Sequence, residues 1–342
     1  MKDRLANFDF ARHNAEVKEV WAAYERGQPT RAPIILGLAT RFFMMHPEAN
    51  ARGWTFRQYI EDPNAMFEAR LEFARWASFN ILQDAELGLP EKWNIWVDFQ
   101  NYYEAAWFGC PVEYLGDEVP DTRPAFADAP ERVMERGLPE PFSGLTGRVR
   151  EYVDLFRERA RKESYLGRPI EVTSASGMGT DGIMTVACNL FGCDFVCAAM
   201  AEEPERLHRL FDFITEATIQ RIKAFRQLFN IPVPCDHFWF ADDSIAMIST
   251  AMYREHVLPY HRKLCVALAT EKPRSIHLCG DATRHFRTLR DELYVQTFDT
   301  GFPVDFGRLR RELGPQVRIM GGPHIEFLRT ATPLQVRDEV RR

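Results

Sequence analysis

Residues 275–281 have the sequence SIHLCGD, the stretch of the chain that says most about its fold and its candidate site. His277 and Cys279 lie two residues apart in an expected strand, so the alternation of a strand points both side chains to the same face. A soft thiolate and an imidazole then converge on one point. Gly280 and Asp281 follow at once, which indicates that the strand ends in a turn where backbone can approach a ligand.

Composition favours one large domain, residues 1–342, because 342 residues with 46% hydrophobic content are ample for a single core. The net charge of -6 and the absence of a Lys/Arg block argue against nucleic-acid and membrane-surface binding. The chain has no signal-peptide pattern and no run of roughly 20 apolar residues, so we expect it in the cytoplasm. Seven cysteines without a CxxC pair favour reduced thiols.

Short apolar runs that end in glycine or aspartate predict seven buried strands. They are 32–38, 79–84, 169–174, 233–240, 275–279, 295–299 and 317–321. Helical periodicity occupies much of the sequence between them. The predicted helices cover 9–27, 56–76, 151–162, 203–225 and 306–313, with further helices from 250 and from 333.

Strands that alternate with helices indicate repeated β-α units and a parallel sheet. A barrel of this kind closes with eight strands. With seven counted, we expect a (β/α)8 TIM barrel whose eighth βα unit is missing from this sequence. Residues 1–30 are expected to form an N-terminal helical extension. Residues 91–150, rich in aromatics and prolines, are expected to form an elaborated insertion.

Three segments resemble patterns of the uroporphyrinogen decarboxylase-like superfamily, in the same order and relative place. They are FADDSIAMISTAMYREHVLPYHRKL at 240–264, HLCGD at 277–281, and VDFGRLRRELGPQVRIMGGPHIEFLRTATPLQVRDEV at 304–340. The superfamily includes the decarboxylase itself and methyltransferases that work with corrinoid proteins. The resemblance covers residues 200–342 well and the N-terminal half loosely, and it implies a barrel with its site at the C-terminal ends of the strands.

The resemblance is closer to the methyltransferase branch, because His277 and Cys279 are similar to its zinc motif. A further cysteine ligand of that branch lies in the last strand, which this sequence does not contain. His324 could supply a third ligand instead, or act as a loop histidine near the metal. The resemblance thus implies Zn²⁺, a small-molecule substrate, and a methylcorrinoid carried by a partner protein. The alternative for His277 and Cys279 is a core histidine beside a packed thiol.

The decarboxylase branch fits less well. Its arginine-rich motif after the first strand is absent, and the corresponding residues 37–43, GLATRFF, offer only Arg41 for substrate binding. Asp84 and Glu86 lie at the end of the second expected strand, near the place of the decarboxylase's substrate-binding aspartate. Asp84 is accordingly a catalytic candidate and Glu86 a substrate-binding one, and both could equally cap a turn.

Other candidates lie at the expected ends of later strands. Asp242, Asp243 and Asp299 are catalytic candidates, as acid/base groups or as partners of a metal-bound histidine. Capping the following turn is the alternative for the adjacent pair, and only one of the two should face the site. His237 and Trp239, in the strand before them, are substrate-binding candidates or barrel-filling residues.

Three functions therefore remain open. The first is a zinc-dependent methyltransferase that moves a methyl group between a small substrate or thiol and a corrinoid protein. The second is a carboxy-lyase that acts on a tetrapyrrole or another acidic substrate. The third is a non-catalytic module that binds a corrinoid or its carrier.

Overall fold

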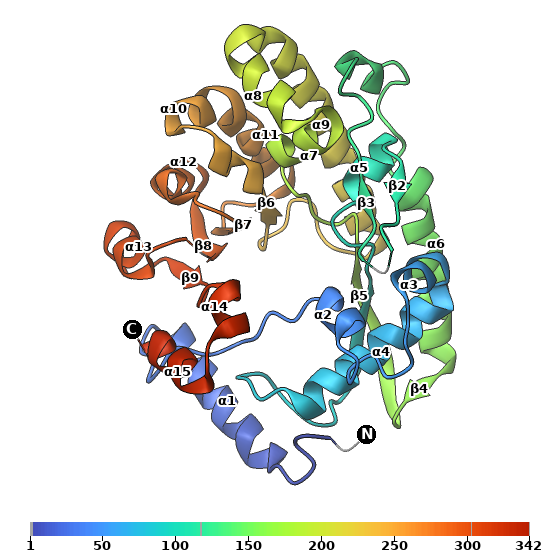
Figure 1. Cartoon of the computed structure of the whole chain (residues 1–342), viewed down its shortest axis with the longest axis vertical. Helices are drawn as coiled ribbons and strands as arrows, with labels where there is room; N and C mark the ends of the chain where they lie inside the picture. Colours follow the sequence, from blue (N-terminus) through green and yellow to red (C-terminus); the bar gives the residue numbers. More distant parts are fainter. Residues whose placement is uncertain (1–2, 117, 302, 342) are drawn as a thin grey trace. The chain divides into compact units, whose positions relative to one another are not determined.

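A computed structural model describes residues 3–116, 118–301 and 303–341 (Figure 1). Contacts group the chain into two compact units, each built from several segments. The first comprises Met1–Gln100, Tyr114–Asp121 and Arg148–Ser176, and the second comprises Asn101–Glu113, Thr122–Gly147 and Gly177–Arg342. A single domain over residues 1–342 stays a prediction, as does the closure of all strands into one barrel.

The first unit combines helices with a small sheet in the order β1-β5-β4. Its helices are α1 (Phe10–Glu25), α2 (Thr40–Met45), α3 (Phe56–Glu61), α4 (Pro63–Asn80) and most of α6 (Gly144–Lys162). Its strands are β1 (Trp93–Val97), β4 (Ser164–Tyr165) and β5 (Arg168–Ala175). β1 alternates between buried and exposed residues and pairs in parallel with β5, which is typical of a strand covered on one face.

Helices α3 and α4 take the place of one predicted helix at 56–76 because the chain turns at Asp62. Pro63 occupies the first helical position of α4, and the Asp62 carboxylate accepts a hydrogen bond from the Asn64 backbone N–H at 2.8 Å. Proline lacks the N–H needed to continue a helix but suits the first turn of a new one. These three residues therefore account for the break between α3 and α4.

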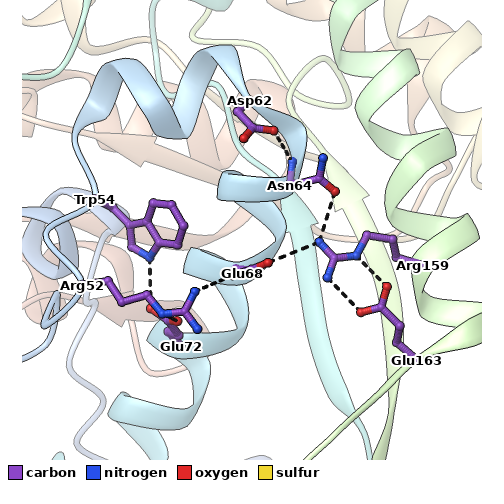
Figure 2. A network of polar contacts seen from close by, with 8 residues as sticks. All are labelled: Arg52, Trp54, Asp62, Asn64, Glu68, Glu72, Arg159 and Glu163. Atoms are coloured by element: carbon purple, nitrogen blue, oxygen red, sulfur yellow. Dashed lines mark hydrogen bonds and ion pairs between the residues drawn. The ribbon is translucent and has the colours of Figure 1, made fainter.

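A network of charges on the surface of the first unit connects α4 to α6 (Figure 2). Arg159 pairs with Glu163 at 2.7 Å, contacts Glu68 at 3.8 Å and donates to Asn64 at 3.3 Å. Glu68 also accepts a hydrogen bond from Arg52 at 2.5 Å. Single exposed ion pairs contribute little, whereas a shared network of this kind restrains the side chains that make it.

The second unit contains the sheet β6-β7-β8-β9 and most of the helices. Its strands are β2 (Val112–Glu113), β6 (Trp239–Ala241), β7 (Arg274–Leu278), β8 (Val295–Thr300) and β9 (Arg318–Met320), while β3 (Asp121–Thr122) lies at the unit boundary. Its α-helices are α5 (Tyr103–Phe108), α7 (Ile183–Phe191), α8 (Cys193–Glu202), α9 (Pro204–Leu228), α10 (Thr250–Met252), α11 (Leu258–Leu268), α12 (Phe286–Leu293), α13 (Phe306–Leu313), α14 (Ile325–Thr330) and α15 (Pro333–Arg341). Short 3-10 turns span Pro130–Val133, Asp243–Met247 and Thr283–His285, and a π-helical turn spans Tyr253–Val257.

All neighbouring strands of this second sheet run parallel, and helices connect them in the order that β-α repeats predict. Figure 1 shows α12 and α13 outside the strands β7, β8 and β9 that they connect. The core includes the fully buried Phe240, Ile276 and Phe298, one from each of β6, β7 and β8. The predicted strands at 275–279, 295–299 and 317–321 and the helices at 203–225 and 306–313 are confirmed, within a few residues at their ends.

Two predicted strands are wrong. Residues 32–38 are extended but belong to no sheet, because the Asp84 carboxylate and the Gln83 amide accept the backbone N–H groups of Ile34 and Leu36. Residues 79–84 begin as the end of α4 and continue as a turn. Side chains thus satisfy backbone groups that a neighbouring strand would otherwise take, and an apolar run by itself cannot reveal this.

Two further predictions need adjustment. The strand expected at 233–240 is reduced to β6, because the residues before Trp239 form only an isolated bridge at Cys235. The expected insertion at 91–150 contains β1, which is part of the first unit's sheet. Among the described residues, no single helix is long and apolar enough to cross a membrane, and only α7 and α8 taken together, bent by 110°, meet that test.

Candidate metal centre

Parallel pairing brings the ends of β6, β7 and β8 side by side. His277 on β7 lies opposite Ala241 on β6 and opposite Asp299 on β8. Asp243 follows β6 by two residues, and Cys279 follows β7 directly. The carboxyl ends of parallel strands are where α/β folds gather their functional side chains, and here they gather ligand-type residues from three adjacent strands.

The side chains of His277 and Cys279 meet as the alternation predicts. His277 Nε2 lies 3.1 Å from Cys279 Sγ, and His277 Nδ1 lies 2.9 Å from Asp299 Oδ2. A carboxylate on one ring nitrogen fixes the orientation of the imidazole and leaves the other nitrogen for a metal. Asp299 is therefore placed to hold His277, and not to bind the same ion.

Asp243 completes a set of three donors. One ligand atom each of Asp243, His277 and Cys279 lies within 4.8 Å of the other two. Asp243 Oδ1 also accepts a hydrogen bond of 2.6 Å from the Cys279 backbone N–H, which ties the loop after β6 to the end of β7. A thiolate, an imidazole and a carboxylate are ligands that zinc accepts, and a set of three leaves a fourth position open.

The electrostatics of this cluster favour a cation. The hydrogen bond with Asp299, followed by that with Cys279, raises the pKa of His277 to about 10. In the metal-free protein the imidazole is therefore protonated at neutral pH. A metal at Nε2 would replace that proton, as metal binding to histidine generally requires.

The cluster is accessible from outside the second unit's core. The side chains of His277 and Asp299 are 31% and 43% exposed, and Cys279 is exposed. Gly280, directly after Cys279, has a left-handed φ of +73°, which a glycine adopts without strain. The backbone therefore turns sharply directly after Cys279.

Asp242, adjacent to Asp243, faces the other way. It is fully buried, and its carboxylate accepts hydrogen bonds from the backbone N–H groups of Met184 and Thr185 at 3.0 and 2.9 Å. The Thr185 hydroxyl donates to it at 2.8 Å, and His261 Nε2 lies 2.9 Å away. Asp242 thus caps the first turn of α7, in agreement with the expectation that only one of the pair faces the site.

The other candidates of the second unit are Trp239, His237 and His324. The Trp239 ring, 45% exposed, lies 6.5 Å from the His277 ring between centroids. His237 is exposed and precedes β6. His324 is the residue before α14, and among the described residues it does not belong to the group of converging donors.

Three candidates lie in the first unit. Asp84 is buried and forms a bidentate pair with Arg31 at 2.5 and 2.7 Å, which lowers the pKa of the Asp84 carboxyl. Glu86 is exposed and pairs with Lys18 at 3.2 Å. Arg41 is exposed and donates to the Gln100 side chain at 3.2 Å. Asp84 thus has a clear structural partner.

Sequence reasoning assigned Asp243 an acid/base role and overlooked it as a metal donor. It also missed Thr185 and His261, which surround Asp242. The hydrogen bond from His261 to Asp242 joins residues 19 apart, and that from Thr185 joins residues 57 apart. No local sequence pattern predicts such contacts. The position of Asp243 at the end of a strand, in contrast, did indicate a residue of the site.

An α/β fold with a parallel sheet and a three-donor cluster at its strand ends defines the class of protein. The chain belongs to the uroporphyrinogen decarboxylase (URO-D) family, whose pattern matches residues 16–342. A relative, the methylated-thiol–coenzyme M methyltransferase of Methanosarcina mazei, is 26% identical over 243 residues, 70% of this chain and 60% of that protein. The chain thus aligns with less than two thirds of that relative's length.

A solved structure shows the same fold. It is a methyltransferase from Methanosarcina mazei with a TM-score of 0.61, 15% sequence identity, and coverage of 90% of this chain and 82% of that one. The fold is therefore of the URO-D type, and the distant kinship with a methyltransferase points to an enzyme.

Proposed function

We propose that this protein is a zinc-dependent methyltransferase that moves a methyl group between a small thiol or similar substrate and a corrinoid carried by a partner protein. The observation that carries the proposal is the convergence of Asp243, His277 and Cys279, with Asp299 behind the histidine. The kinship with a methylated-thiol methyltransferase supports the same chemistry.

The donor set fits zinc. Cys279 would provide the soft sulfur ligand, His277 its Nε2 nitrogen, and Asp243 a carboxylate oxygen. When bound, zinc supplies a Lewis acid that keeps a substrate thiol deprotonated and nucleophilic at neutral pH. His324, which does not belong to this group of three donors, remains a proposed additional ligand.

The chain's own residues would prepare this site. Asp299 holds the His277 ring in one orientation, and the hydrogen bond from the Cys279 N–H fixes the Asp243 carboxylate. Trp239, beside His277, would offer an apolar surface to the substrate. A corrinoid protein would dock where its methyl group can reach this point.

A decarboxylase function has weaker support. Its acidic substrate would need a basic cluster, and the residues where that cluster is expected offer Arg41, whose guanidinium already donates to Gln100. The buried Asp84 is paired with Arg31 and is poorly available as a substrate-binding carboxylate. Decarboxylation is therefore kept only as the alternative outcome that the following experiment tests.

The experiment incubates zinc-loaded protein with methylcobalamin and a panel of small thiols under anaerobic conditions. Demethylation of the cobalamin, followed by its visible absorbance, should require both the thiol and zinc, and should be lost in Cys279→Ser. The matched control is Cys193→Ser, which changes an exposed thiol on α8. Decarboxylation of uroporphyrinogen without methyl transfer would contradict the proposal.

A further inference from the structure

The loop 177–182, GMGTDG, packs against β6, the strand that Asp243 follows, within the second unit. A Cβ atom at Gly182 would approach Ala241 O to 2.2 Å and Asp242 Cβ to 2.3 Å. A Cβ atom at Gly179 would lie 3.4 Å from the Trp239 ring. The loop therefore packs directly on the end of β6, beside the residues that would contact a substrate.

A fully buried ion pair binds the backbone of this loop. Arg221 on α9 and Glu104 on α5 pair at 2.6 Å with 0% and 1% side-chain exposure. Glu104 also accepts a hydrogen bond from the Asp181 backbone N–H at 2.5 Å, and Arg221 donates to Gly179 O at 2.8 Å. The Tyr103 hydroxyl donates to the same carbonyl at 2.9 Å.

Burying two charges is costly unless their geometry and hydrogen bonds compensate for the lost water. Here both members of the pair also hydrogen-bond to the backbone of one loop. It therefore fixes the position of residue 181 without engaging the side chain of that residue. The Asp181 carboxyl makes no hydrogen bond or ion pair with any residue in the part of the chain that the structure describes.

The Asp181 carboxyl lies in a negative potential. Burial, followed by the neighbouring carboxylates of Glu104 and Asp243, raises its pKa to about 8, although Arg221 acts in the opposite direction. Arg221 is committed to Glu104 and offers Asp181 no direct pairing. A cation from outside the chain would lower this pKa and stabilise the ionised carboxylate.

We propose that the substrate is a small thiol, or its methyl thioether, that carries an ammonium group, and that Asp181 binds this group. The inference rests on the proposed methyltransferase function and adds the substrate class. Cys279, His277 and Asp243 would receive the sulfur end, while the pinned loop presents Asp181 to the amino end. A negatively charged thiol would keep Asp181 in its protonated form, which offers no ion pair, and would meet Asp299 as a like charge.

The test uses cobalt-loaded protein, in which thiolate binding to the metal is followed by visible absorbance. The probes are cysteamine, 2-mercaptoethanol and 3-mercaptopropionate, which have similar lengths and carry positive, zero and negative charge. We expect cysteamine to bind about 10- to 100-fold more tightly than 2-mercaptoethanol, because a charge-assisted hydrogen bond contributes about 1.5–3 kcal/mol. 3-Mercaptopropionate should bind most weakly.

The variants isolate the role of Asp181 from the intrinsic acidity of each thiol, which is the same for every protein tested. Asp181→Asn should bring the three affinities within a few-fold of one another relative to wild type, and Asp181→Lys should shift the preference toward 3-mercaptopropionate. Asp194→Asn, on the exposed start of α8, should keep the wild-type preference. Cobalt content should stay unchanged in all three variants.

Unchanged affinity ratios in Asp181→Asn and Asp181→Lys would overturn this inference while leaving thiol binding, and hence the proposed function, intact. Tightest binding of 3-mercaptopropionate to the wild type would overturn it as well. If no thiol changes the spectrum of any cobalt-loaded protein, the thiol-binding function itself fails, and the substrate class fails with it.

Discussion

His277 Nδ1 lies 2.9 Å from Asp299 Oδ2, across adjacent positions of β7 and β8. The contact leaves Nε2 directed at Cys279 and makes the histidine a better ligand than a free imidazole. Because parallel pairing places the two residues opposite each other, the sheet itself builds this relationship.

Replacing Asp299 should therefore weaken metal binding without removing a ligand. We expect Asp299→Ala to reduce zinc affinity about 10- to 100-fold, the usual effect of losing such a partner. Competition with a zinc-binding dye measures the change. Asp291→Ala, which removes a surface carboxylate on α12, is the control, and equal affinities in both variants would contradict the role of Asp299.

The adjacent residues Asp242 and Asp243 should respond differently to substitution. Asp242→Ala leaves the first turn of α7 and His261 without their buried acceptor, and should lower the free energy of unfolding by about 3 kcal/mol or more. Asp243→Ala should cost about 1 kcal/mol and instead reduce metal binding. Urea unfolding measures both variants, and equal costs would contradict the assignment of Asp242 as a structural residue.

Gly182 and Gly192 test the close packing of the loop on β6. Both have left-handed φ values, +93° and +89°, so alanine is strained at either position. Only at Gly182 would the added Cβ also overlap neighbouring atoms, those of Ala241 and Asp242. Gly192→Ala should cost about 1 kcal/mol and Gly182→Ala about 3 kcal/mol or more. Thermal unfolding of the two variants at the same protein concentration measures the difference. A similar fall in melting temperature in both would contradict the close packing of Gly182 on β6.

His285 should make stability depend on pH. Its ring is fully buried, with Nε2 2.9 Å from Ile245 O, and burial lowers the pKa of His285 to about 4. The unfolded chain takes up this proton near pH 6.5, whereas the folded protein does not until about pH 4, so stability is lost as the pH falls between these values.

The full effect of His285 amounts to about 3 kcal/mol, from a pKa difference of roughly 2.5 between the two states. Denaturant unfolding at a series of pH values from 7.5 to 4 measures it. His285→Gln keeps an amide donor for Ile245 O but cannot titrate, so its stability should fall less steeply with acid. A slope equal to that of the wild type would rule out His285 as the source.

The second half of the fold was predictable from sequence because its signals are local. β7, β8, β9 and α13 follow from apolar runs and periodicity, whereas α12 was not predicted. The convergence of His277 and Cys279 follows from strand alternation alone. The family resemblance rests on the same residues. The tertiary fold brings Asp243 next to His277 and Cys279. The sequence indicated only that Asp243 lies at the end of a strand.

The first half was less predictable because contacts distant in sequence decide it. The carboxylate of Asp84 binds Arg31 and the Ile34 N–H, and so an apolar run that reads as a strand remains outside any sheet. β1 lies among aromatic residues that read as an insertion. The buried pair of Glu104 and Arg221, 117 residues apart, has no sequence signature at all.

Metal content is the most direct test of the account. Elemental analysis of protein purified without chelators should find about one zinc per chain in the wild type and in Cys193→Ser, and little or none in Cys279→Ser. All three should remain folded, because Cys279 is exposed and contributes little to packing. A well-folded wild-type protein without zinc that also fails to bind added zinc would contradict the metal centre, and with it the proposed methyltransferase chemistry.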